Sequence, residues 1–438
     1  MKKTLGVILL FICCLAEGQQ TAILSQRDQA RVIDELTEDR LRNVLPALMR
    51  REGIDLWVMI SRENNEDPVL RTMLPATWLA ARRTTMLIVF DPGAGRDVEF
   101  LAVARYDVGK IFKKAWDPAA NVDQWVQLAR LIDERNPKKI GINKADAYGH
   151  ADGLTASDFE KFLEKLPKRL HSHVTSAQNL SVAWLETRSE KEMTLYPQIC
   201  RIAHQIIAQG FSEKVIQPGI TTSEDVVWWY RDRIKKLGLD TWFHPSVSIQ
   251  RNITEEAIAG LPQPLVIQPG DLLHVDFGIT YLRLNTDTQQ HAYVLKPGET
   301  TVPDYLTNAF KRANKLQDIL VGNFKEGKTG NQILADSRKQ AIDQGITPSI
   351  YTHPIGFHGH ASGTTIGMWD MQSGVPKTGD YPMHYRTAYS IELNATVYVI
   401  EWKKEVRIML EEDGYFDENG FRFIDGRQTE IMTIPRQK

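Results

Sequence analysis

A carboxylate stands in the apolar middle of one predicted strand, Asp271-Leu272-Leu273-His274-Val275-Asp276-Phe277-Gly278. A second acid, Asp287, follows Asp276 by eleven residues. If the chain turns near Tyr281 and Leu282, the two strands form a hairpin in which the two aspartates face each other. Side chains that face each other in a hairpin have Cβ atoms ~4.5–5.5 Å apart. Two carboxylates at that separation repel each other unless a proton or a cation lies between them. The alternative is that Asp287 lies in an exposed turn.

Three histidines lie within eight residues in the segment His353-Pro354-Ile355-Gly356-Phe357-His358-Gly359-His360. Neutral imidazole is the commonest metal ligand, and histidine is also the usual general acid or base near neutral pH. This density of histidines, with glycines between them, favours a functional loop. The alternative is a polar loop whose histidines face water, and the residues alone assign no role to His358.

Two glutamates lie on a second predicted hairpin. A turn at residues 401–404 sets Glu392 opposite Glu411, which again places acid against acid. Side chains alternate between the two faces of a strand, so Glu411 lies on the face opposite to Leu410, whereas Glu412 points with the apolar residues. This alternation favours Glu411 over Glu412 as the functional acid. Solvated acids in a charged loop are the alternative.

These three segments together supply four carboxylates and one imidazole. Such an oxygen-rich set suits two divalent ions, such as Mn, Co, Fe or Zn, better than one structural zinc. Paired metal ions ~3.5–4 Å apart can share a bridging hydroxide that acts as a nucleophile at neutral pH. The sequence therefore favours a two-metal hydrolase.

The chain has 438 residues, which is more than one hydrophobic core usually organises, so we expect two domains. Apolar residues at helical spacing predict a helix over residues 27–52, which Gly53 ends. A buried strand is predicted at residues 56–60. Further strands are predicted at residues 86–90, 99–103 and 139–142. Strands that alternate with helices indicate an α/β first domain that ends near residue 180.

A long helix is predicted to begin at Thr187 or Ser189, to run past Phe211 and to open the second domain. Cys200 lies in the apolar pattern of this helix, which favours a buried small side chain over a nucleophile. If the N-terminal segment is removed, Cys200 is the only remaining thiol. A lone cysteine forms no intrachain disulfide, so the mature protein would depend on core packing alone.

The second domain contains a faint internal repeat. A Gly-x-Thr sequence leads into a predicted helix that ends at Gly238, and another leads into a helix that ends near Gly345. Thr221 and Glu224 have the spacing of a capping box at the start of the first helix. Two similar helical units about a hundred residues apart indicate a duplicated, pseudo-symmetric domain.

The N-terminus has the pattern of a secretory signal. Two lysines precede an apolar run over residues 5–15, and Ala16-Glu17-Gly18 has small residues at the spacing of a cleavage site. We therefore predict a signal peptide over residues 1–18 and a secreted or periplasmic protein. A lipoprotein would instead use Cys13 or Cys14. No later segment has 18 uninterrupted apolar residues, so no membrane span is expected.

The composition is that of an ordinary globular protein, with 42% hydrophobic and 25% charged residues. The net charge is −2, from 53 basic and 55 acidic side chains. No basic run is dense enough for a nucleic-acid footprint, so we expect no nucleic-acid partner.

These motifs resemble those of the pita-bread metallopeptidases, which include methionine aminopeptidase, aminopeptidase P, prolidase and the metal-free creatinase. Asp276 stands in a strand similar to the family's D-x-G motif, and Asp287 has the family's spacing from it. His353-Pro354-Ile355-Gly356 is similar to the family's H-x-I/L-G motif, and His360 follows seven residues later.

The last two motifs of the family are also similar. Ser390-Ile391-Glu392 resembles the family's T/S-I-E motif, and Glu411-Glu412-Asp413 resembles its closing strand. The order of all five ligand positions agrees. The resemblance implies an α/β creatinase-like N-terminal domain over residues 19–180. It also implies an α+β pita-bread catalytic domain with pseudo-two-fold symmetry over residues 181–438.

The resemblance assigns the metal ligands as Asp276, Asp287, His353, Glu392 and Glu411. It implies that Glu392 also shuttles a proton and that His360 hydrogen-bonds the scissile carbonyl. The expected cofactors are two divalent ions, Mn first, with Zn, Co or Fe as alternatives. The expected substrate is a short peptide cleaved from its N-terminus, by an X-Pro aminopeptidase or a dipeptidase. A different amide or C–N hydrolase and a metal-free binding protein are the alternatives, and a homodimer or larger homo-oligomer is left open.

Four positions depart from the family pattern. Glu256-Ala257-Ile258-Ala259-Gly260 lacks the substrate-contacting histidine that the family usually has there, and His244 comes too early to align with it. Leu393 replaces a proline, Met409 replaces an arginine, and Ser349 stands where aminopeptidase P and prolidase have a histidine. These departures spare the metal ligands but leave the substrate class open.

Overall fold

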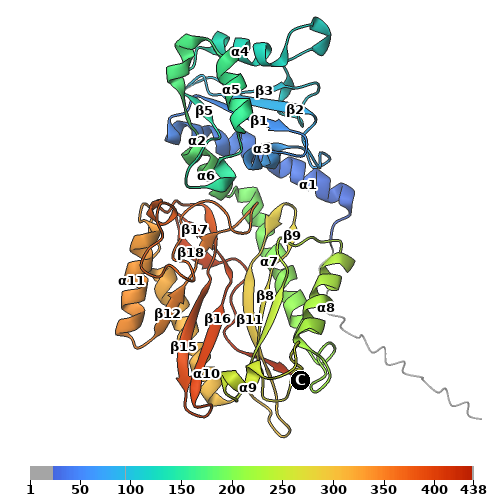
Figure 1. Cartoon of the computed structure of the whole chain (residues 1–438), viewed down its shortest axis with the longest axis vertical. Coiled ribbons are helices and arrows are strands. Elements are labelled where there is room, and N and C mark those ends of the chain that lie inside the picture. Colours follow the sequence, from blue (N-terminus) through green and yellow to red (C-terminus); the bar gives the residue numbers. More distant parts are fainter. Residues whose placement is uncertain (1–22, 94, 437–438) are drawn as a thin grey trace, which may run out of the picture.

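The computed structural model describes residues 23–93 and 95–436. The predicted signal peptide, with Cys13 and Cys14, lies outside the described residues. Figure 1 shows two lobes, a smaller one built from the first part of the chain and a larger one built from the rest. Among the described residues, no helix is long and apolar enough to cross a membrane.

The first lobe is a three-layered α/β unit around one six-stranded sheet of order β4-β3-β2-β1-β5-β6. The strands are β1 (Leu56–Arg62), β2 (Thr84–Phe90), β3 (Glu99–Val103), β4 (Lys113–Lys114), β5 (Ile140–Ile142) and β6 (Val174–Ser176). The helices are α1 (Gln26–Asp39), α2 (Leu45–Glu52), α3 (Pro68–Met73), α4 (Gln124–Arg135), α5 (Ala156–Lys165) and α6 (Gln178–Glu186). Short helical turns complete it at η1 (Arg40–Val44), η2 (Pro118–Ala120), η3 (Gly149–Ala151) and η4 (Lys168–His173).

Alternation along β1 decides which helices cover which face of this sheet. Trp57 and Met59 pack with α2, α3 and α6, whereas Val58 and Ile60 pack with α4 and α5. The predicted strands and the predicted first helix are confirmed, and Gly53 ends α2 with a φ of 65°. The proposed boundary at residue 180 stays a prediction, and α6 belongs to the core of this lobe.

The second lobe contains two similar halves, which confirms the predicted repeat. In each half, two helices accompany three antiparallel strands. The first half has α7 (Glu190–Gly210), α8 (Ser223–Lys236), β7 (Ser246–Gln250), β8 (Leu272–Phe277) and β11 (Thr288–Val294). The second has α10 (Asp304–Gly322), α11 (Gly330–Asp343), β12 (Thr347–Ile350), β15 (Leu393–Val399) and β16 (Lys404–Leu410).

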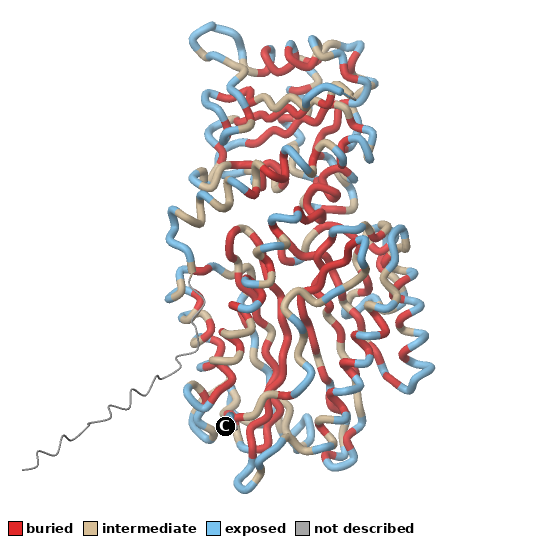
Figure 2. Tube along the Cα trace, turned by 180° about the vertical axis from the view of Figure 1, so that it is seen from behind, coloured by how far each residue is buried: buried red, intermediate tan, exposed pale blue. Residues whose placement is uncertain are grey.

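The two halves meet where β11 lies beside β16, joined by paired backbone hydrogen bonds between Gln289 and Glu411. Shorter elements complete this lobe: α9 (Glu255–Ala259), β9 (Thr280–Tyr281), β10 (Leu284–Asn285), β13 (His353–Pro354), η5 (Thr378–Asp380), β14 (Thr387–Ser390), β17 (Asp413–Asp417), β18 (Gly420–Phe423) and β19 (Met432–Ile434). Figure 2 shows that the buried backbone follows these central strands, while the outer helices alternate between buried and exposed residues.

Two helix ends differ from the sequence predictions. Ser189 caps α7 with a full capping box, as expected, but α7 ends at Gly210 and does not pass Phe211. Thr222 and Asp225 form the capping box of α8, one residue later than predicted. Thr221 is used elsewhere, because its hydroxyl accepts a hydrogen bond from the Gln217 N–H. Cys200 on α7 is buried, as predicted.

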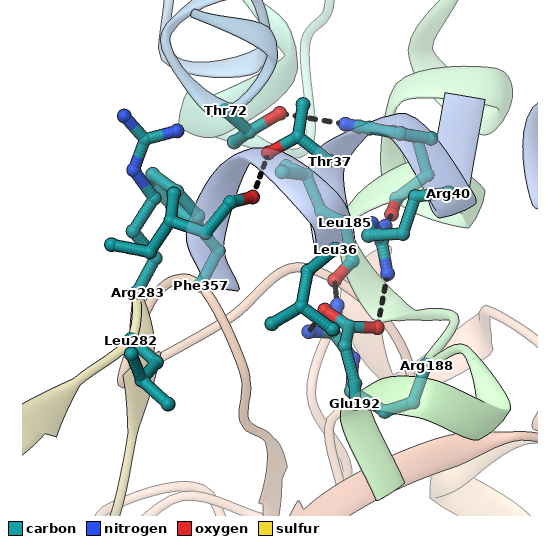
Figure 3. Close-up of a pocket in the computed structure, with 12 residues that line it drawn as sticks. Leu36, Thr37, Arg40, Thr72, Leu185, Arg188, Glu192, Leu282, Arg283 and Phe357 are labelled. Atoms are coloured by element: carbon teal, nitrogen blue, oxygen red, sulfur yellow. Dashed lines mark hydrogen bonds and ion pairs between the residues drawn. The ribbon is translucent and has the colours of Figure 1, made fainter. Parts of the chain in front are cut away.

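A buried ion cluster joins the two lobes. The carboxylate of Glu192, near the start of α7, forms ion pairs with Arg40 at 2.7 Å and with Arg188 at 3.1 Å. All three side chains are buried. Figure 3 shows Glu192 between the two arginines, with Arg283 and Phe357 of the second lobe nearby. Removing one partner of such a cluster would leave an uncompensated buried charge. We therefore expect replacement of any of these three residues to destabilise the contact between the lobes.

Candidate metal centre

In the hairpin that carries the two aspartates, the turn lies one residue later in the sequence than predicted. Its turn consists of Leu282 and Arg283, both with positive φ, between the paired residues Tyr281 and Leu284. Asp276 therefore pairs with Gln289 and not with Asp287. Moving a turn by one residue moves each partner by two, so Asp287 is a diagonal neighbour of Asp276 and remains on the same face.

The second acidic pair lies as predicted. β15 and β16 pair antiparallel with Leu393 beside Leu410, and the Ile391 N–H donates to the Glu412 carbonyl. Continuing this register by one residue sets Glu392 opposite Glu411. The turn before β16 lies at residues 400–403, close to the predicted position.

His353 completes the group from β13, where it pairs with Ser390. Its Nδ1 lies 3.0 Å from the Pro354 carbonyl, an acceptor that requires a proton on Nδ1. The Nε2 lone pair then points at the acids, 3.7 Å from both Asp287 Oδ2 and Glu411 Oε1.

The potential ligand atoms form three overlapping groups, each within 4.8 Å. The groups are Asp276, Asp287 and Glu411; His353, Glu392 and Glu411; and Asp287, His353 and His360. Buried Asp276 Oδ1, Asp287 Oδ1 and His353 Nε2 have no hydrogen-bond partner among the described residues. Buried polar atoms are normally paired. Orphaned oxygens and an imidazole nitrogen that converge are what a divalent cation would satisfy, so the residues fit a metal.

Electrostatics lead to the same conclusion. Burial, followed by the nearby Glu411, raises the pKa of Asp276, Asp287 and Glu392 well above the usual values. Carboxylates this close cannot all be ionised without a counter-charge. Bound divalent cations would reverse the shifts, because a cation favours the ionised form of each acid.

The two neighbouring glutamates of the closing strand have different surroundings. Glu411 faces the centre, where Ser390 Oγ donates to its Oε1 at 2.6 Å. Glu412 points away and is saturated by His204 Nε2 at 2.7 Å, Gln290 Nε2 at 2.8 Å and the Gln428 N–H at 3.0 Å. The geometry therefore agrees with the choice of Glu411.

A model of the metallopeptidase family M24 matches residues 196–417, just over half of the chain. This chain belongs to metallopeptidase family M24. The matched residues contain all five predicted ligands, and the fold is the predicted pita-bread fold with an N-terminal α/β domain. M24 peptidases are hydrolases, so the predicted enzyme class is confirmed.

Solved structures with this fold cover nearly the whole chain. The X-Pro aminopeptidase from Thermotoga maritima aligns with a TM-score of 0.61 and 16% identity, over 88% of this chain and 99% of that one. The Xaa-Pro dipeptidase from Bacillus anthracis gives 0.56 and 16%, over 93% and 100%. The prolidase from Pyrococcus horikoshii gives 0.54 and 15%, over 92% and 100%. A comparison with curated protein sequences gives no significant match.

His360 lies beside the predicted ligands of this M24 peptidase. Its ring meets that of His353 edge to face, with centroids 4.7 Å apart, and Trp242 covers another side at 5.0 Å. Burial, the largest cause, lowers the pKa of His360 to about 4. The imidazole is therefore neutral at pH 7 and can donate one N–H. Gly359 is required here, because a Cβ would lie 2.3 Å from the Trp242 ring.

His244 and His358, the two histidines whose roles the sequence left unassigned, lie away from the predicted metal ligands. His244 is exposed, with Nδ1 3.0 Å from Arg231 and its ring against Trp228. It does not line the cavity beside His360. His358 stacks on His150 of the first lobe, with centroids 4.0 Å apart and the planes inclined by 11°.

Sequence reasoning missed Gln289. Its Nε2 donates to Glu392 Oε1 at 2.9 Å and to Glu411 Oε2 at 2.6 Å, and its Oε1 lies 2.9 Å from His274 Nε2. The amide thus positions two predicted ligands of the M24 centre by hydrogen bonds. A signal existed, since Gln289 follows Asp287 by two residues and must share its face of β11.

A cavity of about 710 Å³ opens beside His360 between the two lobes. Its walls come from α1, the segment around α3, the β9–β10 turn and the loop that carries His358. This volume lies within the usual range of ~300–1,000 Å³ for small-ligand sites. A space large enough for a short peptide therefore lies beside the M24 centre.

Proposed function

We propose that this M24 peptidase is a two-metal exopeptidase that removes residues from the N-terminus of short peptides, as an X-Pro aminopeptidase or a dipeptidase. One observation carries the proposal: five predicted ligand side chains converge, three of them with an unpaired buried atom, beside His360, which lines a peptide-sized cavity. The fold shared with X-Pro aminopeptidases and prolidases supports the substrate class.

The ligand groups support a division into two metal positions. Asp276 and Asp287 would hold one ion, and His353 and Glu392 would hold the other. Glu411 recurs in both of these groups, and Asp287 recurs in two of the three, which suits them as bridging ligands. Mn is the first choice of metal, with Zn, Co or Fe as alternatives, because all accept mixed carboxylate and imidazole ligands.

The residues around the ions supply the remaining chemistry. When bound, the two ions would lower the pKa of a water held between them and would so supply a hydroxide nucleophile at neutral pH. Glu392 accepts the proton released by that water and returns it to the leaving amine, which balances the hydrolysis. The neutral imidazole of His360 donates its N–H to the scissile carbonyl oxygen as negative charge develops there.

The N-terminal sequence supports a secreted or periplasmic location. Cleavage after residue 18 would remove the charged and apolar segments together. The intact mass of the protein recovered from outside the cytoplasm tests this. A mass that retains residues 1–18 would exclude cleavage, and a lipid-modified mass starting at Cys13 or Cys14 would favour a lipoprotein.

A peptide-library digest with added Mn or Zn tests the proposed activity. The protein is incubated with a mixture of short peptides, and the products are read by mass spectrometry. We expect removal of a single N-terminal residue, with peptides that carry proline in the second position cut fastest. The Glu392→Gln variant is the control for contaminating peptidases. Cleavage of non-peptide amides alone would favour the other amide hydrolase, and a protein that recruits no divalent ion would exclude the metal mechanism.

A further inference from the structure

Tyr351 lies beside the predicted metal ligands, and its hydroxyl forms no hydrogen bond with another residue that the structure describes. The centroid of its half-buried ring lies 5.5 Å from that of His353 and 5.7 Å from that of His360. Because the rings of His353 and His360 are themselves 4.7 Å apart, the three rings form a compact triangle. The phenol of Tyr351 therefore borders the same space as the imidazole of His360.

The backbone on both sides of Tyr351 is fixed. Tyr351 follows β12, and its N–H donates to the Glu392 carbonyl at 3.1 Å. The next residue, Thr352, exchanges two backbone hydrogen bonds with Ile366, at 3.0 and 2.8 Å. Side chains alternate along an extended chain, so Tyr351 points to the same side as His353. The phenol is thus held in place before any substrate binds.

The hydroxyl of Tyr351 also lies close to three of the predicted ligands. An ordinary phenol keeps its proton at neutral pH. Burial, and then the charges of Glu392, Glu411 and Asp287, raise the pKa of Tyr351 further, to about 12. Bound cations would engage the oxygens of these carboxylates, which leaves the hydroxyl proton free to be shared with an oxygen of the substrate.

His360 is the one donor that the proposed mechanism assigns to the scissile carbonyl, whereas such sites commonly use more than one. The segment 256–260, where a substrate-contacting histidine is missing, lies at α9 and lines a different cavity together with residues of β16. His244 is exposed and lies against Trp228. Neither of them supplies a second donor beside His360, which leaves that position to Tyr351.

We propose that Tyr351 is a further catalytic residue, whose hydroxyl donates a hydrogen bond to the scissile carbonyl oxygen alongside His360. The inference rests on the proposed peptidase function and deepens it. Tyr351 keeps its O–H bond throughout, so the proton balance of the hydrolysis is unchanged. Negative charge develops on the carbonyl oxygen only as the nucleophile attacks, so this hydrogen bond is stronger in the transition state than in the bound substrate. Such a bond raises kcat more than it lowers KM.

Tyr351→Phe tests the proposal, because it removes the hydroxyl and keeps the ring beside His353 and His360. Tyr398→Phe is the matched control, since Tyr398 on β15 is 61% exposed and has no proposed role. The metal-loaded proteins are assayed with Ala-Pro and Ala-Pro-Ala. A hydrogen bond to a charged group contributes roughly 10- to 100-fold. We expect kcat of Tyr351→Phe to fall by that factor with KM nearly unchanged, and Tyr398→Phe to behave as wild type.

The metal content and the far-UV circular dichroism of Tyr351→Phe should match the wild type, because the phenol is not a proposed ligand. An unchanged kcat, or a rise in KM alone, would overturn the proposal. A loss of bound metal that accounts for the lost activity would also overturn it, because Tyr351 would then support the metal site and not the substrate.

Binding without turnover separates this inference from the proposed function. Two analogues of Ala-Pro resist cleavage: a phosphinic analogue, with a tetrahedral phosphorus that carries oxygen, and a reduced analogue, with CH₂ in place of the carbonyl. In calorimetry, Tyr351→Phe should weaken the phosphinic analogue by the same factor as kcat/KM and should leave the reduced analogue unaffected.

The two proposals can then fail independently. If the wild type cleaves no peptide but its affinity for the phosphinic analogue depends on the Tyr351 hydroxyl, the peptidase proposal fails and the donor role stands. If peptides are cleaved but the wild type and Tyr351→Phe bind the phosphinic analogue equally, the donor role fails and the peptidase proposal stands.

Discussion

His204 on α7 lies between two acids, and its replacement is expected to destabilise the second lobe in a pH-dependent way. Its Nε2 lies 2.7 Å from Glu412 Oε2, and its Nδ1 lies 3.1 Å from Asp425 Oδ2. With an acceptor at each nitrogen, the ring must carry both protons. Burial alone would lower the pKa of His204, but Glu412 and then Asp425 outweigh burial and raise it to about 10.

The magnitude follows from that shift. A rise from 6.5 to about 10 is roughly 3.5 pH units, or about 5 kcal/mol at 1.36 kcal/mol per unit. Breaking a buried ion pair from one side typically costs about 3–5 kcal/mol. We therefore expect His204→Gln to lower the free energy of unfolding by about 3–5 kcal/mol at pH 6.5.

The sign of the pH dependence is set by the raised pKa. Because the folded value exceeds the unfolded one, the contribution of His204 is fully present below about pH 6.5 and is lost as the pH rises through about 10. The difference between wild type and His204→Gln should therefore shrink steadily between pH 7 and pH 10.

Urea denaturation of the metal-loaded protein, followed by tryptophan fluorescence at several pH values, measures this difference. His384→Gln is the control, since His384 pairs with Glu326 at 3.1 Å near the surface and should cost about 1 kcal/mol or less. Metal stoichiometry should not change in His204→Gln, because Glu412 is not a proposed ligand. A loss of stability that is the same at pH 6.5 and pH 9.5 would refute the buried imidazolium.

Three further outcomes test the metal centre. Glu392→Gln should lower kcat by at least ~10²-fold, the usual contribution of a proton-transfer group, with the far-UV circular dichroism unchanged; retained turnover would show that the proton shuttle is misassigned. Glu411→Gln should reduce bound metal in elemental analysis whereas Glu412→Gln should not, and the reverse result would move the ligand by one residue. Chelation should lower the melting temperature more at pH 8 than at pH 5.5. The raised pKa values of Asp276 and Asp287 make the metal-free fold less stable as pH rises. An equal drop at both pH values would contradict the predicted repulsion between the carboxylates.

Local patterns predicted much of the fold because helices and strands have fixed periods. The apolar spacing of residues 27–52 and the capping residue Ser189 are properties of short segments, and the structure has helices at both positions. The face on which Glu411 lies follows from a period of two, so the choice against Glu412 needed no tertiary information. The order of the four acids along the chain could also be read directly from the sequence.

Other features depended on contacts that no local pattern contains. The turn at Leu282 and Arg283 lies one residue later than expected, which changes the partner of Asp276 although both aspartates keep their face. The role of Gln289 required knowing that β11 lies beside β16. Register between distant strands is decided by how whole sheets pack, and a single residue's shift has little local signature.

The sequence by itself therefore determined which side chains are candidate metal ligands, because residue type and strand parity are local properties. Tertiary structure alone decided what stands around them. His204 reaches Glu412 across 208 residues, and Arg71 approaches His358 from the other lobe. Such neighbours arise when long loops close and separate cores pack together, which brings distant residues into contact at an entropic cost that only the complete fold repays.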